Sequence, residues 1–337
     1  MLYPTYKCEI SSLLIEPDTS DDLTIINVKL GMNNASAPNY FEGVLRRRKG
    51  QDRGFAKGDP VRISLGYRNN DDGGNGKSDL TDVFNGSIYS AKAQDTKIKI
   101  TALTPFIKLC NLRLDRFYEQ QSAGAIVKDL AHTADVSIDA ASEGIQFPSY
   151  AISSSKSAYE HIIELAGLCG FDFYSTNKAK LVFRKYEARK THLLEYGKNI
   201  INIHKVDQSL SAGSVKVFGS SPSSSRGSDV WHWLTKKNVQ GSSGIERGNT
   251  QLSIQSKAIR DEDTAKEVAD VTLKRLKSLM VVINTVGNAK IMLGDAAKIQ
   301  GVPEQDLNGE FQVRGIEHFL SKSYGFTTVV ACVGSIS

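Results

Sequence analysis

The sequence predicts an α+β protein that is mainly β, in which two antiparallel β modules flank a small helix-strand repeat domain. Three observations lead to this fold class. Short runs of alternating polar and apolar residues, separated by Gly, Asn, Asp and Ser, occur along most of the chain, which is typical of antiparallel sheets. A helical unit occurs twice in the middle of the chain, and a β motif that begins with Gly-Asp occurs on each side of it.

The strand runs come first because they make up most of the chain. Lys97–Leu103 alternates polar and apolar residues, so one face is expected to be buried and the other exposed. The other predicted strands are residues 24–30, 61–67, 83–90, 181–186, 200–206, 215–219, 251–255, 289–293, 311–319 and 326–333.

Three segments predict helices. Ser122 can cap a first helix, and Ser157 with Glu160 forms a capping box at the start of a second, since each side chain can accept a free N–H of the first turn. Gly170 can end that second helix in a left-handed conformation. The third helix is expected over residues 263–279, where apolar residues recur at helical spacing and lysine and arginine gather at the C-terminal end.

The helical unit repeats at a constant offset. Ser122-Ala123 matches Ser157-Ala158, and each capped helix leads into a short apolar strand. Two such units make one small α+β domain, which we place at residues 106–186. The first β module then covers residues 1–105, and the second covers residues 187–337 and includes the 263–279 helix.

The β repeat relates the two ends of the chain. Gly58-Asp59 before a strand matches Gly294-Asp295 before another, and Asn85-Gly86 matches Asn308-Gly309 further on. We interpret Gly-Asp as a tight turn that leads into a strand, and Asn-Gly as a hairpin turn. The intervals differ by about the length of the polar segment 68–80, so that segment is expected to be a loop inserted in the first module only. The alternative is a chance match between common turn dipeptides.

Composition limits the class of protein. The chain has 337 residues, 40% hydrophobic and 23% charged, which suits two or three globular domains and excludes general disorder. No apolar run approaches the ~20 residues of a membrane helix, and no secretory signal is visible, so we expect no membrane insertion. The cysteines, Cys8, Cys110, Cys169 and Cys332, have no metal or redox spacing and are expected to be reduced thiols.

The charge is uneven. The net charge is +5, but residues 42–57 and 181–205 each hold six basic and two acidic residues, a local +4. The run Arg46-Arg47-Arg48-Lys49 could contact nucleic acid or an acidic partner. Because no aromatic residues are interleaved with it as a stacking platform, a solvated turn is the better interpretation, and we do not expect specific nucleic-acid binding.

No motif predicts a catalytic, cofactor or metal site. Gly76-Lys77-Ser78 resembles the end of a phosphate loop, but Asp71 stands where that loop needs glycine. Asp71, Asp72, Asn75 and Asp79 lack calcium-loop spacing, so a solvated loop is expected. The remaining candidates are six histidines without a close pair and two tryptophans that fit packing or a protein contact better than a sugar platform. They are His132, His161, His192, His204, His232, His318, Trp231 and Trp233.

Several stretches, taken in order, resemble the baseplate hub proteins of contractile phage tails and injection systems: the phage late control D proteins, the hub of phage T4 and the N-terminal part of type VI secretion VgrG spikes. The first forty residues match least. The matching stretches are Phe55-x-x-Gly58-Asp59-x-Val61-x-Ile63-x-x-Gly66-Tyr67, Phe84-x-Gly86-x-Ile88, Gly170-Phe171-x-Phe173, Leu181-x-Phe183, Glu195-Tyr196-Gly197-Lys198-Asn199-Ile200, Val215-x-Val217-x-Gly219, the 263–279 helix, Gly294-Asp295, Ile299-x-Gly301, Leu307-Asn308-Gly309-x-Phe311-x-Val313, His318 and Gly325-Phe326-x-Thr328.

The resemblance implies that both β modules are tube-like β-barrels and that the chain is a structural hub rather than an enzyme. It implies a homotrimer whose six barrels form a pseudo-sixfold ring between the tail tube and the central spike. The implied partners are a tail tube or tube-initiator protein, a separate spike protein, and tape-measure and baseplate wedge proteins. The implied location is the baseplate of a virion tail or phage-tail-like particle, assembled in the bacterial cytoplasm. The 68–80 loop is then expected to point to a baseplate partner or the next subunit.

Two functions of other classes stay open at this point. One is a tail-associated enzyme that degrades the cell wall, which would need paired carboxylates or a Cys-His site in the α+β domain. The other is a carbohydrate- or DNA-binding β protein that uses Trp231, Trp233 or the basic run at Arg46. Because the chain stops about where the second barrel should close, we expect the spike and any wall-degrading enzyme to be separate proteins.

Overall fold

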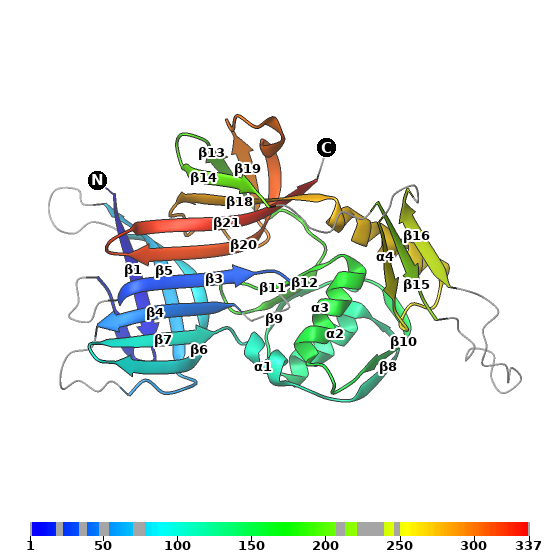
Figure 1. Cartoon of the computed structure of the whole chain (residues 1–337). Helices are drawn as coiled ribbons and strands as arrows, with labels where there is room; N and C mark the ends of the chain where they lie inside the picture. The colour runs from blue at the N-terminus through cyan, green and yellow to red at the C-terminus, as the bar shows by residue number, and fades with distance from the viewer. Residues whose placement is uncertain are drawn as a thin grey trace, which may run out of the picture.

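The computed structural model describes residues 2–17, 23–33, 39–46, 54–69, 78–206, 213–220, 239–245 and 250–335. The protein is mainly β, with a few helices, as the sequence predicts. Figure 1 shows a curled β structure at one end and a helical region with small sheets at the other. Among these residues, no helix is both long and apolar enough to cross a membrane.

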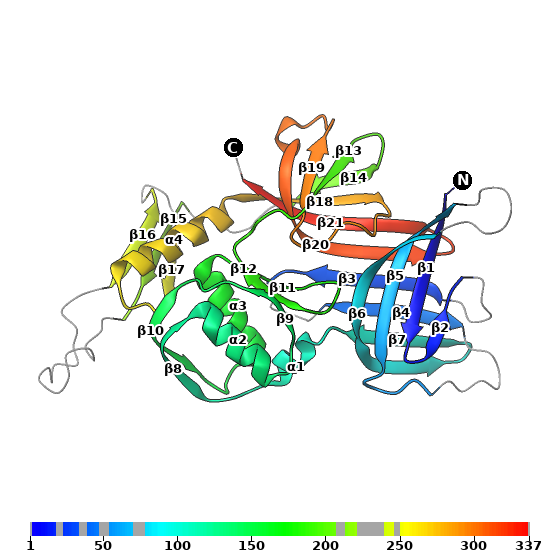
Figure 2. The same cartoon turned by 180° about the vertical axis from the view of Figure 1, so that it is seen from behind.

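The N-terminal module is a curled antiparallel sheet. Figures 1 and 2, seen from opposite sides, show β1, β5 and β6 crossing over β3, β4 and β7, so the sheet folds over its own apolar face. Its spatial order is β3-β4-β7-β6-β5-β1-β2. The strands are β1 (Leu2–Ile10), β2 (Leu13–Ile15), β3 (Leu23–Gly31), β4 (Tyr40–Arg46), β5 (Pro60–Asn69), β6 (Ser78–Gln94) and β7 (Lys97–Leu103).

The C-terminal module repeats this arrangement in the order β14-β18-β21-β20. Strand β19 pairs with β20, and β13 pairs with β19. A 3₁₀ turn, η2 (Gln305–Leu307), precedes β20. Residues 289–293, predicted as a strand, instead form turns held by the Asn288 and Asp295 side chains. The strands are β13 (Thr191–Glu195), β14 (Ile200–Lys205), β18 (Ser278–Val286), β19 (Ala296–Gln300), β20 (Gly309–Ser321) and β21 (Gly325–Ser335).

Between the modules, the chain forms two capped helix-strand units. The Ser122 hydroxyl accepts the Ala125 N–H, and Ser157 and Glu160 complete the predicted capping box. Gly170 ends the second helix at φ 68°, as predicted. The elements are α1 (Phe106–Asn111), β8 (Arg116–Ser122), α2 (Ala123–Thr133), β9 (Ile138–Ala141), β10 (Gln146–Ile152), α3 (Ala158–Cys169), β11 (Asp172–Ser175) and β12 (Leu181–Arg184).

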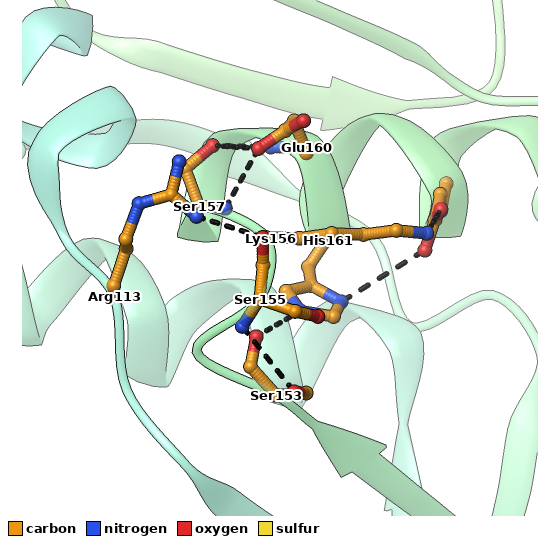
Figure 3. A network of polar contacts seen from close by, with 8 residues as sticks. Arg113, Ser153, Ser155, Lys156, Ser157, Glu160 and His161 are labelled. Atoms are coloured by element: carbon orange, nitrogen blue, oxygen red, sulfur yellow. Dashed lines mark hydrogen bonds and ion pairs between the residues drawn. The ribbon is translucent and has the colours of Figure 1, made fainter.

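Figure 3 shows the loop that leads into α3 and the contacts that hold it. Glu160 reaches back to the Ser157 N–H at 2.7 Å, while the Arg113 guanidinium donates to the Ser155 carbonyl at 2.9 Å. The buried His161 ring lies 3.1 Å from the Ser153 carbonyl. These contacts tie the start of α3 to the segment after α1, which gives His161 a structural role.

A second insertion joins the same region. It contains β15 (Ser214–Phe218), β16 (Gln240–Gly244), β17 (Gln251–Gln255) and α4 (Glu262–Leu276). Helix α4, predicted over 263–279, is capped by Asp261, whose carboxylate accepts the Thr264 N–H, and ends at Leu276. Ser278 and Leu279, predicted as helix, instead begin β18. Figures 1 and 2 place this insertion beside α2 and α3, at the end of the molecule away from β1.

The buried apolar residues divide into two cores. One lies within the two β modules, and the other joins α1, α2 and α3 to β15 and α4. The cores cross the domain ranges that the sequence predicts: Val215, Val217 and Val268 lie in the range 187–337 yet pack in the second core, whereas Tyr174 and Val182, from the range 106–186, pack in the first. The three ranges stay a proposal, with β15 and α4 packed on the middle region.

Candidate assembly surfaces

The two β modules correspond strand by strand. In chain order and in spatial order, β3, β4, β5, β6 and β7 match β14, β18, β19, β20 and β21. All pairings among these strands are antiparallel in both modules. The outermost strand differs, because β1 is antiparallel to β5 whereas β13 is parallel to β19. The modules are therefore repeats of one five-stranded unit.

Two irregularities in the ladders match as well, whereas a third, between Ile63 and Ser64 in β5, is found in the first module only. The register shifts between Ile88 and Ser90 in β6, and between Val313 and Gly315 in β20. A second shift occurs at the start of β3, after Leu23, and at the start of β14, after Ile200. Because a bulge adds one residue to one strand, bulges at the same places fix the alignment of the two modules.

The Gly-Asp motif makes the same backbone hydrogen bonds in each module. The Gly58 N–H donates to the Ile88 carbonyl at 2.8 Å, and the Ile88 N–H donates to the Asp59 carbonyl at 2.8 Å. In the second module, Gly294 and Asp295 make the same two bonds to Val313, at 3.2 and 2.9 Å. Both glycines have positive φ, 98° and 84°. The predicted β repeat is confirmed for this motif, which clips the turn onto the following strand.

The predicted Asn-Gly hairpin turns are wrong. Asn85-Gly86 lies inside β6, where Gly86 pairs with Val61. A Cβ at Gly86 would overlap the Leu103 carbonyl oxygen, so the glycine permits a close approach of strands rather than a turn. Asn308 caps η2 and bonds to both backbone groups of Val302.

A buried contact between His192 and Asp295 distinguishes the Gly-Asp turn of the second module from that of the first. Asp295 accepts the Met292 N–H at 3.0 Å, and the same oxygen lies 2.8 Å from Nε2 of the buried His192 on β13. Asp59 makes the equivalent bond to the Ala56 N–H at 2.9 Å, at an exposed site without a histidine. His192 thus ties β13 to the turn that orients β19.

The modules join through a continuous sheet. Strand β3 of the first module pairs antiparallel with β20 of the second, from Gly31 opposite Gly315 to Ile25 opposite Ser321. Ile26, Val28 and Ile316 are fully or almost fully buried along this junction. Two β modules flanking an insert were predicted, and the structure joins both modules directly in one sheet of 13 strands.

The repeat leaves two sheet edges without a strand. Within the described residues, β14 is the counterpart of β3 but pairs only with β18. Residues 90–94 of β6 correspond to the part of β20 that pairs with β3, but in the described structure they pair only with β7. Ile201 on β14 is 56% exposed and Tyr89 on β6 is 51% exposed. Open edges of this kind present free N–H and C=O groups for a further strand.

The predicted site residues are not brought together. Residues 70–77 of the predicted polar loop, the basic run beyond Arg46, His232, and both tryptophans lie outside the described residues. The two ends of that segment are strand rather than loop, and Asp79 in β6 pairs with Lys290 at 2.5 Å. His132 is in the last turn of α2 and His204 is on β14; both are exposed. His318 is fully buried, with Nδ1 at 3.0 Å from the Thr328 hydroxyl, and its burial lowers the pKa to about 3.

We searched the described part of the chain for candidate metal ligands and reactive thiols. It contains no group of three or more histidine, cysteine or acidic residues placed to hold a metal ion. Cys8 and Cys332 are buried free thiols, and burial raises the pKa of each to about 12. A thiol held in its protonated form is a poor nucleophile, so these cysteines act as core residues.

One cleft lies between the two cores, and no sequence motif indicates it. It has a volume of about 470 Å³, and Asp172, Arg275, Glu310 and Arg314 are among its lining residues. Asp172 is buried, which raises its carboxyl pKa, while Arg314 at 3.5 Å and Gln312 at 2.5 Å oppose that rise. Both carboxylate oxygens are therefore engaged, as expected for a contact that fixes β11 against β20.

Comparison with known proteins supports the fold. No family model matches the chain, and no curated protein matches it. Among solved structures, the 43 kDa tail protein of prophage MuSo2 from Shewanella oneidensis superposes with a TM-score of 0.71 at 13% identity, covering 97% of this chain and 98% of that one. The tail protein of Neisseria meningitidis gives 0.72 at 10% identity, covering 98% and 97%. The chain has the fold of phage tail proteins.

The tail-protein fold also occurs in a secretion system. An E. coli component of the type VI secretion system, described as similar to the T4 tail proteins gp27 and gp5, matches with a TM-score of 0.61 at 10% identity, covering 98% of this chain and 77% of that one. The resemblance drawn from sequence motifs to tails and injection systems is thus confirmed at the level of the fold.

Proposed function

We propose that this protein is a structural hub of a contractile tail or injection-system baseplate, a homotrimer that joins the tail tube to the central spike. The repeated β module is the observation that carries the proposal. Two copies of one unit in each chain allow three chains to present six similar units, which matches a sixfold tube on one side and a threefold spike on the other. The tail-protein fold supports the same role.

The middle region fits this role as a separate layer. Its core joins the helix-strand units to β15 and α4, away from the sheet that links the modules. Under the proposal, the modules build the ring, and the helical region is available to baseplate partners such as a tube-initiator, wedge or spike protein. The chain would then act inside the tail baseplate after assembly in the bacterial cytoplasm.

The oligomeric state tests the proposal directly. The purified chain, measured by light scattering over a range of concentrations, is expected to form trimers because each ring needs six modules. The mass should therefore approach three times 36.9 kDa. A mass that stays at one chain at every concentration, or a stable dimer, would contradict the trimeric hub.

The enzyme alternative can be tested at the cleft that contains Asp172 and Glu310. We expect no clearing of cell-wall material in a zymogram, because both Asp172 oxygens are held by neighbouring side chains rather than free for acid-base chemistry. The Asp172→Asn variant is the matched control. Clearing by the wild type that this variant loses would make the protein a wall-degrading enzyme.

A further inference from the structure

We propose that copies of this chain join edge to edge, with β14 of one copy pairing antiparallel with residues 90–94 of β6 in the next. This inference rests on the proposed ring and names its contact surface. It starts from the junction inside the chain, where β3 pairs with β20. If the six modules of a ring are equivalent, each junction between copies should repeat the junction within a copy.

The strand correspondence identifies both sides of the contact. Strand β14 stands where β3 stands, at the end of its module and beside the second strand of the unit. The last part of β6 corresponds to the part of β20 that pairs with β3. In both strands this part follows the residue bonded to the Gly-Asp turn and follows the bulge. Both edges lack a second partner strand among the described residues, whereas their counterparts within the chain are paired with each other.

The bulges fix which residues of β6 face the next copy. Ile88 and Val313 make the same two backbone hydrogen bonds to a Gly-Asp turn, and each precedes the register shift in its own strand. Counting on from Ser90 and Gly315, which follow these shifts, Gln94 corresponds to Phe319. In the chain, Phe319 lies opposite Asn27.

The same argument applies to β14. Leu23 and Ile200 each precede a shift, so Asn27 corresponds to His204. Since Phe319 lies opposite Asn27, Gln94 of one copy is expected to lie opposite His204 of the next. Ala93 then lies opposite Lys205, by the same count.

The contact between copies differs chemically from the junction within the chain. The inner junction buries apolar side chains such as Ile26, Val28 and Leu320. The edges between copies carry Gln94 and His204, which are exposed in the single chain. The contact between copies therefore depends on backbone hydrogen bonds and buries less apolar surface than the β3–β20 junction. It is weaker than that junction and can form late, during assembly. Lysine on such edges also disfavours pairing in a wrong register.

Cysteine cross-linking tests the register. Residues opposite each other in an antiparallel pair have Cβ atoms ~4.5–5.5 Å apart, within reach of a disulfide. The full chain with Gln94→Cys and His204→Cys is expected to oxidise to covalent dimers and closed trimers on a non-reducing gel. A mixture of the two single variants should give covalent dimers only, because the contact joins different edges. Peptide mapping by mass spectrometry separates this link from links to native cysteines.

The matched control moves one cysteine along the same strand. With Gln94→Cys and Ile201→Cys, the offset of three residues adds roughly 10 Å, so the linked fraction should fall by about tenfold. Trimers in solution without the 94–204 link, or with equal linking in the control, would overturn the edge contact and leave the hub proposal standing. Absence of trimers and of any link would overturn both.

Discussion

Replacing Asp295 with alanine is expected to lower the free energy of unfolding by about 3 kcal/mol, since the buried His192 ring and the partly buried Met292 N–H lose their partner. The Asp295 carboxylate accepts the Met292 N–H and contacts Nε2 of His192 inside the second module. Only 4% of the Asp295 surface and 7% of the His192 surface are exposed, so water cannot replace the bond between them. Urea unfolding followed by circular dichroism gives the change.

The first module provides the matched control. Asp59 makes the equivalent bond to the Ala56 N–H, but at an exposed site where water can replace it. Asp59→Ala should therefore cost about 1 kcal/mol or less. A double-mutant cycle between His192→Ala and Asp295→Ala should show a coupling energy of about 2 kcal/mol. Equal costs for Asp59→Ala and Asp295→Ala would show that burial and His192 contribute nothing.

Structural features that depend on contacts within a few residues are predicted correctly from the sequence. Ser122, Ser157 and Gly170 cap helices through bonds within a few residues, so their spacing alone was sufficient. Gly58 and Gly294 lie in tight turns before a strand, as predicted, and the structure adds that both have positive φ. The start of α4 was misplaced by about one residue, because Asp261 and Asp263 are both plausible capping residues in sequence.

Long-range packing could not be predicted in the same way. The bond from Asn27 to Glu317 spans 290 positions, and nothing around either residue indicates that β3 meets β20. Gly86 looked like a turn residue because Asn-Gly is a common turn dipeptide, yet its role depends on the distant Leu103 carbonyl. The packing of β15 and α4 on the helical core likewise depends on contacts across the chain, as does the burial of Asp172.

The repeat shows why the open edges could not be found from sequence. The alignment of Asn85-Gly86 with Asn308-Gly309 is displaced by two residues, because Gly86 corresponds in the ladders to Phe311. Only the hydrogen-bond register shows that β14 corresponds to β3. Once that correspondence is known, the unpaired edges follow from the pairing already present within the chain.

His318 should make the folded state sensitive to acid. Its ring is fully buried on β20, and burial lowers its pKa to about 3, below the ordinary value of 6.5. Between about pH 6.5 and pH 3, the unfolded chain therefore binds a proton that the folded chain does not. Stability falls as the pH is lowered through this window, by roughly 1.4 kcal/mol for each pH unit, and the contribution is fully present above pH 6.5.

The variant His318→Leu isolates this contribution. Leucine fills a similar volume and removes Nε2, which has no hydrogen-bond partner among the described residues. Thr328 keeps its bond from the Asn288 N–H at 2.9 Å, so its hydroxyl is not left unpaired. At pH 7 the variant should be within about 1 kcal/mol of the wild type, whereas at pH 4.5 it should be more stable by about 3 kcal/mol. Urea midpoints at both pH values measure the difference, with exposed His132→Leu as the control; parallel pH profiles for His318→Leu and the wild type would show that His318 is protonated in the folded chain.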